Sequence, residues 1–134
     1  MTQRARGLEF TLTAKITSDA THVRATIKVS AVSNHAESLY GYPIVCPDGY
    51  NPVIVVLDAS GKVVFYPEPL GYPLPGASCP HPRELKLKRC HSVTRHFLLP
   101  RRGKWVQARI GIVKVSHHVE RPSLILTRKL SIAQ

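Results

Sequence analysis

Acidic residues are scarce in this chain. Its 134 residues contain 8 Asp and Glu against 19 Lys and Arg, which gives a formal net charge of +11. None of the acidic residues forms the close carboxylate pair that two-carboxylate hydrolysis requires. No run approaches about 18 uncharged apolar residues, so a transmembrane helix is excluded.

Catalytic motifs are also missing. The sequence contains no G-x-S-x-G, no glycine-rich phosphate loop and no H-E-x-x-H. A Cys90/His96 or Cys79/His81 dyad stays open, because such partners meet in space rather than in sequence. Nothing specific supports either dyad, so we expect a protein that is not an enzyme and needs no cofactor.

Helical periodicity is absent as well. No window places apolar residues at i, i+3, i+4 and i+7 over three turns without a proline. With 43% apolar residues, the chain is nevertheless rich enough to fold, and its length suits one domain over residues 1–134. No secretory leader precedes the first patterned segment. We expect a cytoplasmic protein if Met1 is the natural start, and a secreted or cell-envelope protein if a leader was removed.

Strand patterns fill most of the sequence. Residues 8–17 and 23–31 alternate strictly between apolar and polar, as half-buried antiparallel strands do. The apolar run 53–57 and the segment 62–66 flank Asp58-Ala-Ser-Gly61, which predicts a hairpin. Further strands are expected within these ranges: 84–90, 92–99, 104–116 and 123–132.

Seven or eight short antiparallel strands predict an all-β sandwich of the immunoglobulin-like type. A partly open barrel is the alternative, since strand patterns do not fix how a sheet closes. The long Pro/Tyr/Gly-rich segment 67–83 favours the sandwich, as a crossing between two sheets.

A family resemblance accompanies this architecture. The stretch 57–65, LDASGKVVF, resembles the central hairpin of the bacterial intracellular proteinase inhibitor domain, an immunoglobulin-like sandwich. The run 96–110, HFLLPRRGKWVQARI, is similar to the last strand pair of many immunoglobulin-like modules. The resemblance implies a sandwich fold, and a module that recognises a protein partner.

The three cysteines allow two interpretations. Cys46 and Cys79 each precede a proline in a Gly/Pro-rich loop, which favours a disulfide between them in an oxidising compartment, with Cys90 unpaired. The alternative is three reduced thiols. A zinc site from Cys79, His81, Cys90 and His91 is disfavoured, because the adjacent Cys90 and His91 point to opposite faces of a strand. We therefore expect no metal.

Two features point toward binding. Four tyrosines are expected in irregular Gly/Pro-rich loops, where Tyr gives contact area at low entropic cost and predicts contact with a protein partner: Tyr40, Tyr42, Tyr50 and Tyr72. The segment 83–104 concentrates basic residues and predicts an alternative partner, nucleic acid or another polyanion: Lys86, Lys88, Arg89, Arg101, Arg102 and Lys104.

The basic residues also invite a geometric prediction. If 84–90 is a strand with Leu85 and Leu87 facing the core, Lys86 and Lys88 share its outer face. Arg101 and Arg102 extend the same patch if their turn adjoins the end of that strand. A solvated basic face that only aids solubility is the alternative.

Overall fold

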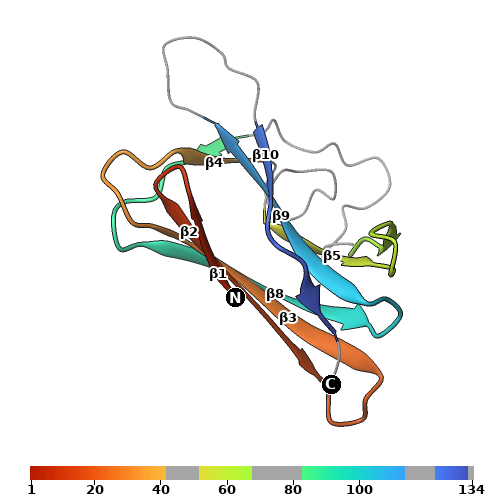
Figure 1. Cartoon of the computed structure of the whole chain (residues 1–134). Helices are drawn as coiled ribbons and strands as arrows, with labels where there is room; N and C mark the ends of the chain where they lie inside the picture. Colours follow the sequence, from red (N-terminus) through yellow and green to blue (C-terminus); the bar gives the residue numbers. More distant parts are fainter. Residues whose placement is uncertain (42–51, 68–82, 114–122, 133–134) are drawn as a thin grey trace, which may run out of the picture.

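The computed structural model describes residues 1–41, 52–67, 83–113 and 123–132 (Figure 1). These residues form two antiparallel sheets, and no helix occurs among them. The first sheet has the order β1-β2-β3-β8, with these bounds: β1 Thr2–Ala5, β2 Leu8–Ile16, β3 His22–Ala31 and β8 Ser92–Pro100.

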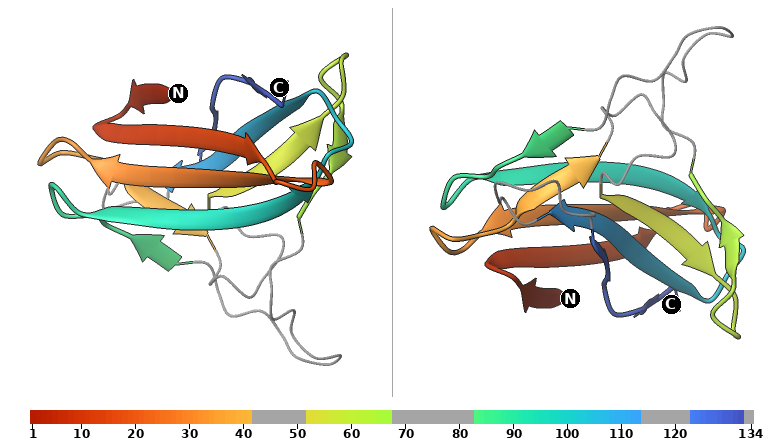
Figure 2. Two further views of the ribbon diagram at one scale, coloured as in Figure 1. Left: turned by 90° about the horizontal axis from the view of Figure 1, so that it is seen from below. Right: turned by 90° about the horizontal axis from the view of Figure 1, so that it is seen from above.

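The second sheet is built around β9, Trp105–Val113. Its other strands are β4 Ser38–Gly41, β5 Val53–Leu57, β6 Val63–Phe65, β7 Arg83–Leu85, β10 Ser123–Leu126 and β11 Leu130–Ser131. Strands β10 and β11 pair with one side of β9, whereas β4 and β5 pair with successive parts of its other side. Figure 2 shows the two sheets as separate layers.

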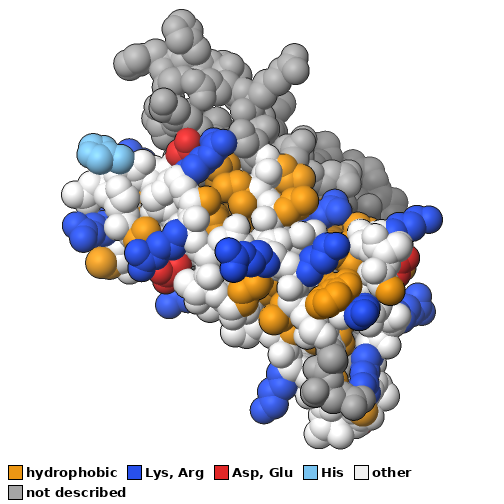
Figure 3. Space-filling model, viewed as in Figure 1, with side chains coloured by type: hydrophobic (Ala, Val, Ile, Leu, Met, Phe, Trp, Pro, Cys, Tyr) orange, Lys and Arg blue, Asp and Glu red, His pale blue; other side chains and the backbone are white. Residues whose placement is uncertain are grey.

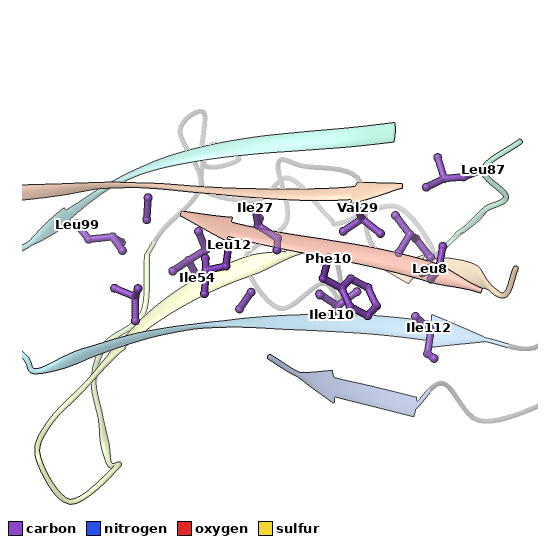
Figure 4. Packing of buried hydrophobic residues seen from close by; sticks show 14 of the residues in the cluster. Leu8, Phe10, Leu12, Ile27, Val29, Ile54, Leu87, Leu99, Ile110 and Ile112 are labelled. Carbon is purple, nitrogen blue, oxygen red and sulfur yellow. The ribbon is translucent and has the colours of Figure 1, made fainter. Parts of the chain in front are cut away.

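The core lies between the two layers, and alternation decides which side chains enter it. Phe10, Ile27 and Ile110 are fully buried in this core, whereas Val55 is buried outside it, between its core neighbours Ile54 and Val56 in β5. Figure 4 shows Phe10 beside Ile110, with Leu12 near Ile54, so that side chains of both sheets interlock. The predicted β-sandwich is therefore confirmed, although the described residues form more strands than the seven or eight expected.

The hairpin predicted at Asp58 is also confirmed. One carboxylate oxygen of Asp58 accepts hydrogen bonds from the backbone N–H of Ser60 and of Lys62, at 2.9 Å each, and from the Ser60 hydroxyl at 2.6 Å. These donors hold the pKa of Asp58 below its usual value, the Ser60 hydroxyl having the largest effect. Asp58 thus fixes the turn between β5 and β6.

Two predicted strands differ from expectation: one ends early and the other is divided in two. The segment 84–90 is a strand only up to Leu85, the last residue of β7. Beyond it, the chain turns through Cys90, whose φ is +71°, to enter β8. The segment 123–132 is divided into β10 and β11 by three residues, Thr127 to Lys129, which stand opposite two residues of β9.

Two other predictions about loops are wrong. Residues 68–82 lie outside the described residues, but β6 and β7, the strands on either side of them, belong to the same sheet around β9, so the expected connection between two different sheets is not found. Tyr40 lies in strand β4, opposite Glu84, rather than in a loop.

Among the described residues, no helix is long and apolar enough to cross a membrane.

Candidate polyanion-binding surface

Two cations stand directly opposite each other at one end of the first sheet. The β2–β3 register makes Lys15 and Arg24 Cα partners, and both side chains are exposed. They share the outer face, because the neighbouring Ile16 and Val23 turn toward the interior. Like charges directly opposite across two strands destabilise a sheet, so this arrangement has an energetic cost.

The turn after β8 adds two more cations at the same end. The backbone N–H of Arg101 donates to Thr21 O at 3.3 Å, and its Nη1 donates to Ala20 O, also at 3.3 Å. Both acceptors belong to the β2–β3 turn. Arg101 is half-buried and Arg102 exposed. We call Lys15, Arg24, Arg101 and Arg102 the cationic end.

The carboxylate nearest in sequence to the cationic end, Asp19, is engaged by its own turn. Its Oδ1 accepts hydrogen bonds from the Thr17 hydroxyl at 2.6 Å, the Thr21 hydroxyl at 2.8 Å and the Thr21 N–H at 3.1 Å. These donors, the Thr17 hydroxyl first, lower the pKa of Asp19 to about 2. Asp19 forms no ion pair with the cationic end within the described ranges.

The other carboxylates whose side chains the structure describes are also engaged. Glu9 pairs with Arg4 at 2.8 Å and Glu37 with Arg6 at 3.2 Å, while Asp58 holds the β5–β6 turn. No carboxylate side chain that the structure describes therefore forms an ion pair with the cationic end. Figure 3 shows the same imbalance on a broader scale, with many Lys and Arg side chains over the visible face and few acidic ones.

The predicted basic residues do not form one patch. Lys86, Lys88 and Arg89 are exposed and lie just before β8, whereas Arg101 and Arg102 follow its last residue. At about 3.3 Å per residue, the nine residues of β8 separate the two groups by about 26 Å. That distance is several Debye lengths at physiological salt, so the two groups act separately.

The segment 86–89 is not a strand, which changes its geometry. Leu87 is buried and the lysines beside it are exposed, as predicted, but they lie in an irregular segment rather than on a pleated strand. Together with Ser33 and Asn34, the segment lines a hollow of about 420 Å³. Lys104, the remaining predicted residue, lies in the β8–β9 turn with its ammonium 5.2 Å from the centre of the Trp105 ring.

Several predicted site residues cannot be placed at this surface. Tyr42, Tyr50, Tyr72, Cys46, Cys79 and His81 lie outside the described residues. Cys90 is exposed and carries a free thiol. Within the described part of the chain, no three His, Cys, Asp or Glu side chains gather closely enough to hold a metal ion.

Sequence reasoning missed Lys15 and Arg24 as a pair, although a signal was present. Both positions fall on the polar face of adjacent alternating segments, and only five residues separate those segments. A tight hairpin between them makes residues equally distant from the turn into partners. The alternation alone does not reveal the pair; the register of the hairpin between the two segments does.

No protein-family model matches the chain, and neither a curated protein nor a solved structure matches it. The resemblance to the proteinase inhibitor domain therefore stays a prediction.

Proposed function

We propose that this protein is a non-catalytic binding module whose cationic end holds a linear polyanion, a phosphate or sulfate polymer. One observation supports the proposal most. Lys15 and Arg24 oppose each other without a counter-ion among the described residues, in a sheet that elsewhere places Glu9 opposite Arg4 with an ion pair of 2.8 Å. An anion bound between the two side chains would attract both of them and offset their mutual repulsion.

The geometry favours binding that ignores base sequence. Lys15 and Arg24 project from a sheet face, and Arg101 and Arg102 from a turn, so they can reach the phosphates of a polymer but enter no groove. The described residues offer no recognition helix. Affinity should therefore depend on charge density and fall steeply with salt.

The test reverses the charge of the opposed pair. The Lys15→Glu/Arg24→Glu variant keeps two like charges opposite each other, so cross-strand repulsion is retained while its sign changes. The Lys86→Glu/Lys88→Glu variant makes the same change in net charge at the other end of β8. Binding is measured by elution from heparin and by fluorescence anisotropy with a single-stranded oligonucleotide at several salt concentrations.

The expected result is a difference between the two variants. The Lys15→Glu/Arg24→Glu variant elutes at lower salt than the control variant, and its log–log salt slope for single-stranded DNA falls by about 1.4, or 0.7 for each lost phosphate contact. Equal shifts would show an effect of net charge alone and overturn the cationic end as the site. Unchanged elution of both would leave a protein partner, met through the tyrosines, as the leading hypothesis.

A further inference from the structure

A cavity of about 510 Å³ opens beside the cationic end, where β2 and β3 meet the β8–β9 turn and the segment after β11. Its volume falls in the range typical of small-molecule sites. Most of the residues that line it are apolar: Ala14, Ile16, Ala20, Val23 and Ile132. The interior therefore suits an apolar body rather than a chain of phosphates.

The rim of this cavity carries a positive group. Arg101 and Ala20 both line the cavity, and the 3.3 Å hydrogen bond from Arg101 Nη1 to Ala20 O holds the guanidinium at that rim. A guanidinium has five N–H donors, so others remain free to bind an anion. No Asp or Glu is among the lining residues, and Lys15 adds a second positive charge nearby.

An apolar interior and a cationic rim together define the ligand. We propose that this cavity binds an alkyl carboxylate of medium chain length, with its hydrocarbon tail between the two sheets and its carboxylate on Arg101. A carboxylate can accept two parallel hydrogen bonds from a guanidinium, and burial of the hydrocarbon tail in the apolar interior removes it from water. The ligand carries a single charge, so this site does not depend on polyanion binding.

The probe is sodium decanoate below its micelle concentration, titrated into the whole protein and followed by amide chemical shifts in NMR spectra. Saturable shifts are expected at Ala14, Ile16 and Val23. The Arg101→Gln variant should bind decanoate about tenfold more weakly, because it loses a charge-assisted contact. The Arg102→Gln variant is the matched control, since Arg102 is exposed and does not line the cavity. Its affinity should change by less than about twofold.

Two further measurements separate the tail from the head. Decanol has the same chain length but no charge, so its affinity should not depend on Arg101. It should bind wild type and the Arg101→Gln variant equally weakly. Ala14→Phe should fill the cavity and abolish decanoate binding while heparin elution stays unchanged. Ile16→Trp serves the same purpose if Ala14→Phe does not fold.

The outcomes that overturn the proposal are specific. Absence of saturable shifts in wild type means that the cavity is not a ligand site for carboxylates. Equal losses in Arg101→Gln and Arg102→Gln mean that the effect is general electrostatics. Because heparin elution of the Lys15→Glu/Arg24→Glu variant tests polyanion binding separately, either proposal can fail while the other stands.

Discussion

Lys15 and Arg24 face each other across the β2–β3 hairpin as two exposed cations. At the far end of the same sheet, Arg4 faces Glu9 and forms an ion pair at 2.8 Å. The fold thus accommodates a matched pair at one end and a mismatched pair at the other. A mismatched pair costs roughly 0.2–1 kcal/mol, a cost that anion binding would offset.

The first prediction concerns that cost. Lys15→Glu places a carboxylate opposite Arg24, so the free energy of unfolding should rise by about 0.5 kcal/mol at low salt, and the gain should shrink as salt screens it. The same variant should elute earlier from heparin, because the cationic end loses a positive charge. Urea unfolding at two salt concentrations and heparin chromatography measure the two effects.

Lys28→Glu is the control for this prediction. Lys28 is exposed on the same face, but its cross-strand partners are Thr11 and Thr94 rather than a cation. The substitution changes net charge equally and should not raise stability as Lys15→Glu does. A stability gain of the same size in Lys28→Glu would show that general charge reduction, rather than the opposed pair, explains the result.

Local patterns predicted most of the framework. Alternation located β2 and β3, and the Asp58 turn located the β5–β6 hairpin, because both signals depend on neighbours in the sequence. The strand β1, Thr2–Ala5, was missed because its residues do not alternate clearly and gain order by pairing with β2. Pairing with the neighbouring strand overrides the weak local preference of these residues.

The candidate site was less predictable for the same reason. The pattern ELKLK alternates like a strand, but only Arg83–Leu85 finds a partner, in β4. Lys86 and Lys88 therefore leave the sheet. Arg101 contacts the β2–β3 turn because β8 lies beside β3. These two strands are about 70 residues apart in the sequence, and composition does not encode their pairing.

The second prediction concerns Thr127, which is 2% exposed and stands where β10 gives way to β11. Its hydroxyl accepts from the Ala108 N–H at 3.0 Å, replacing a bond of the strand ladder. Thr127→Val leaves that buried donor without a partner and should lower the free energy of unfolding by about 1–3 kcal/mol. Thr127→Ser keeps the hydroxyl and should lose less. Chemical denaturation compares them, and equal losses would point to packing instead.

The third prediction concerns Gly103, in the β8–β9 turn. A Cβ at this position would overlap the carbonyl oxygen of Leu57 and lie 2.5 Å from Val56 Cγ1. Gly103→Ala should therefore force the turn away from β5 and lower the free energy of unfolding by about 1–3 kcal/mol. Gly61→Ala is the comparison, because its Cβ would meet the flexible end of Lys129 while its φ of +89° imposes a backbone cost instead.

Thermal unfolding distinguishes the two glycines when each is also replaced by Asn, which tolerates positive φ better than Ala does. At Gly61, Asn should recover part of the loss. At Gly103, it should be at least as harmful as Ala, because the constraint there is space. Recovery by Asn at Gly103 would contradict the steric explanation.

The last prediction concerns acid sensitivity and Asp19. Its folded-state pKa of about 2 lies below the ordinary value of 3.8, owing first to the hydrogen bond from the Thr17 hydroxyl. A carboxyl whose pKa is lowered on folding stabilises the fold above its unfolded pKa, and this contribution disappears as pH falls through the folded value. The free energy of unfolding should therefore decrease between about pH 4 and pH 2.

Asp19→Asn, which can still accept a hydrogen bond but does not titrate, should show a shallower decrease in urea unfolding over this window. The remaining slope should be reduced further by Asp58→Asn, since turn donors lower the pKa of Asp58 in the same way. An unchanged slope in Asp19→Asn would mean that the pKa of Asp19 is the same in the unfolded chain as in the folded one.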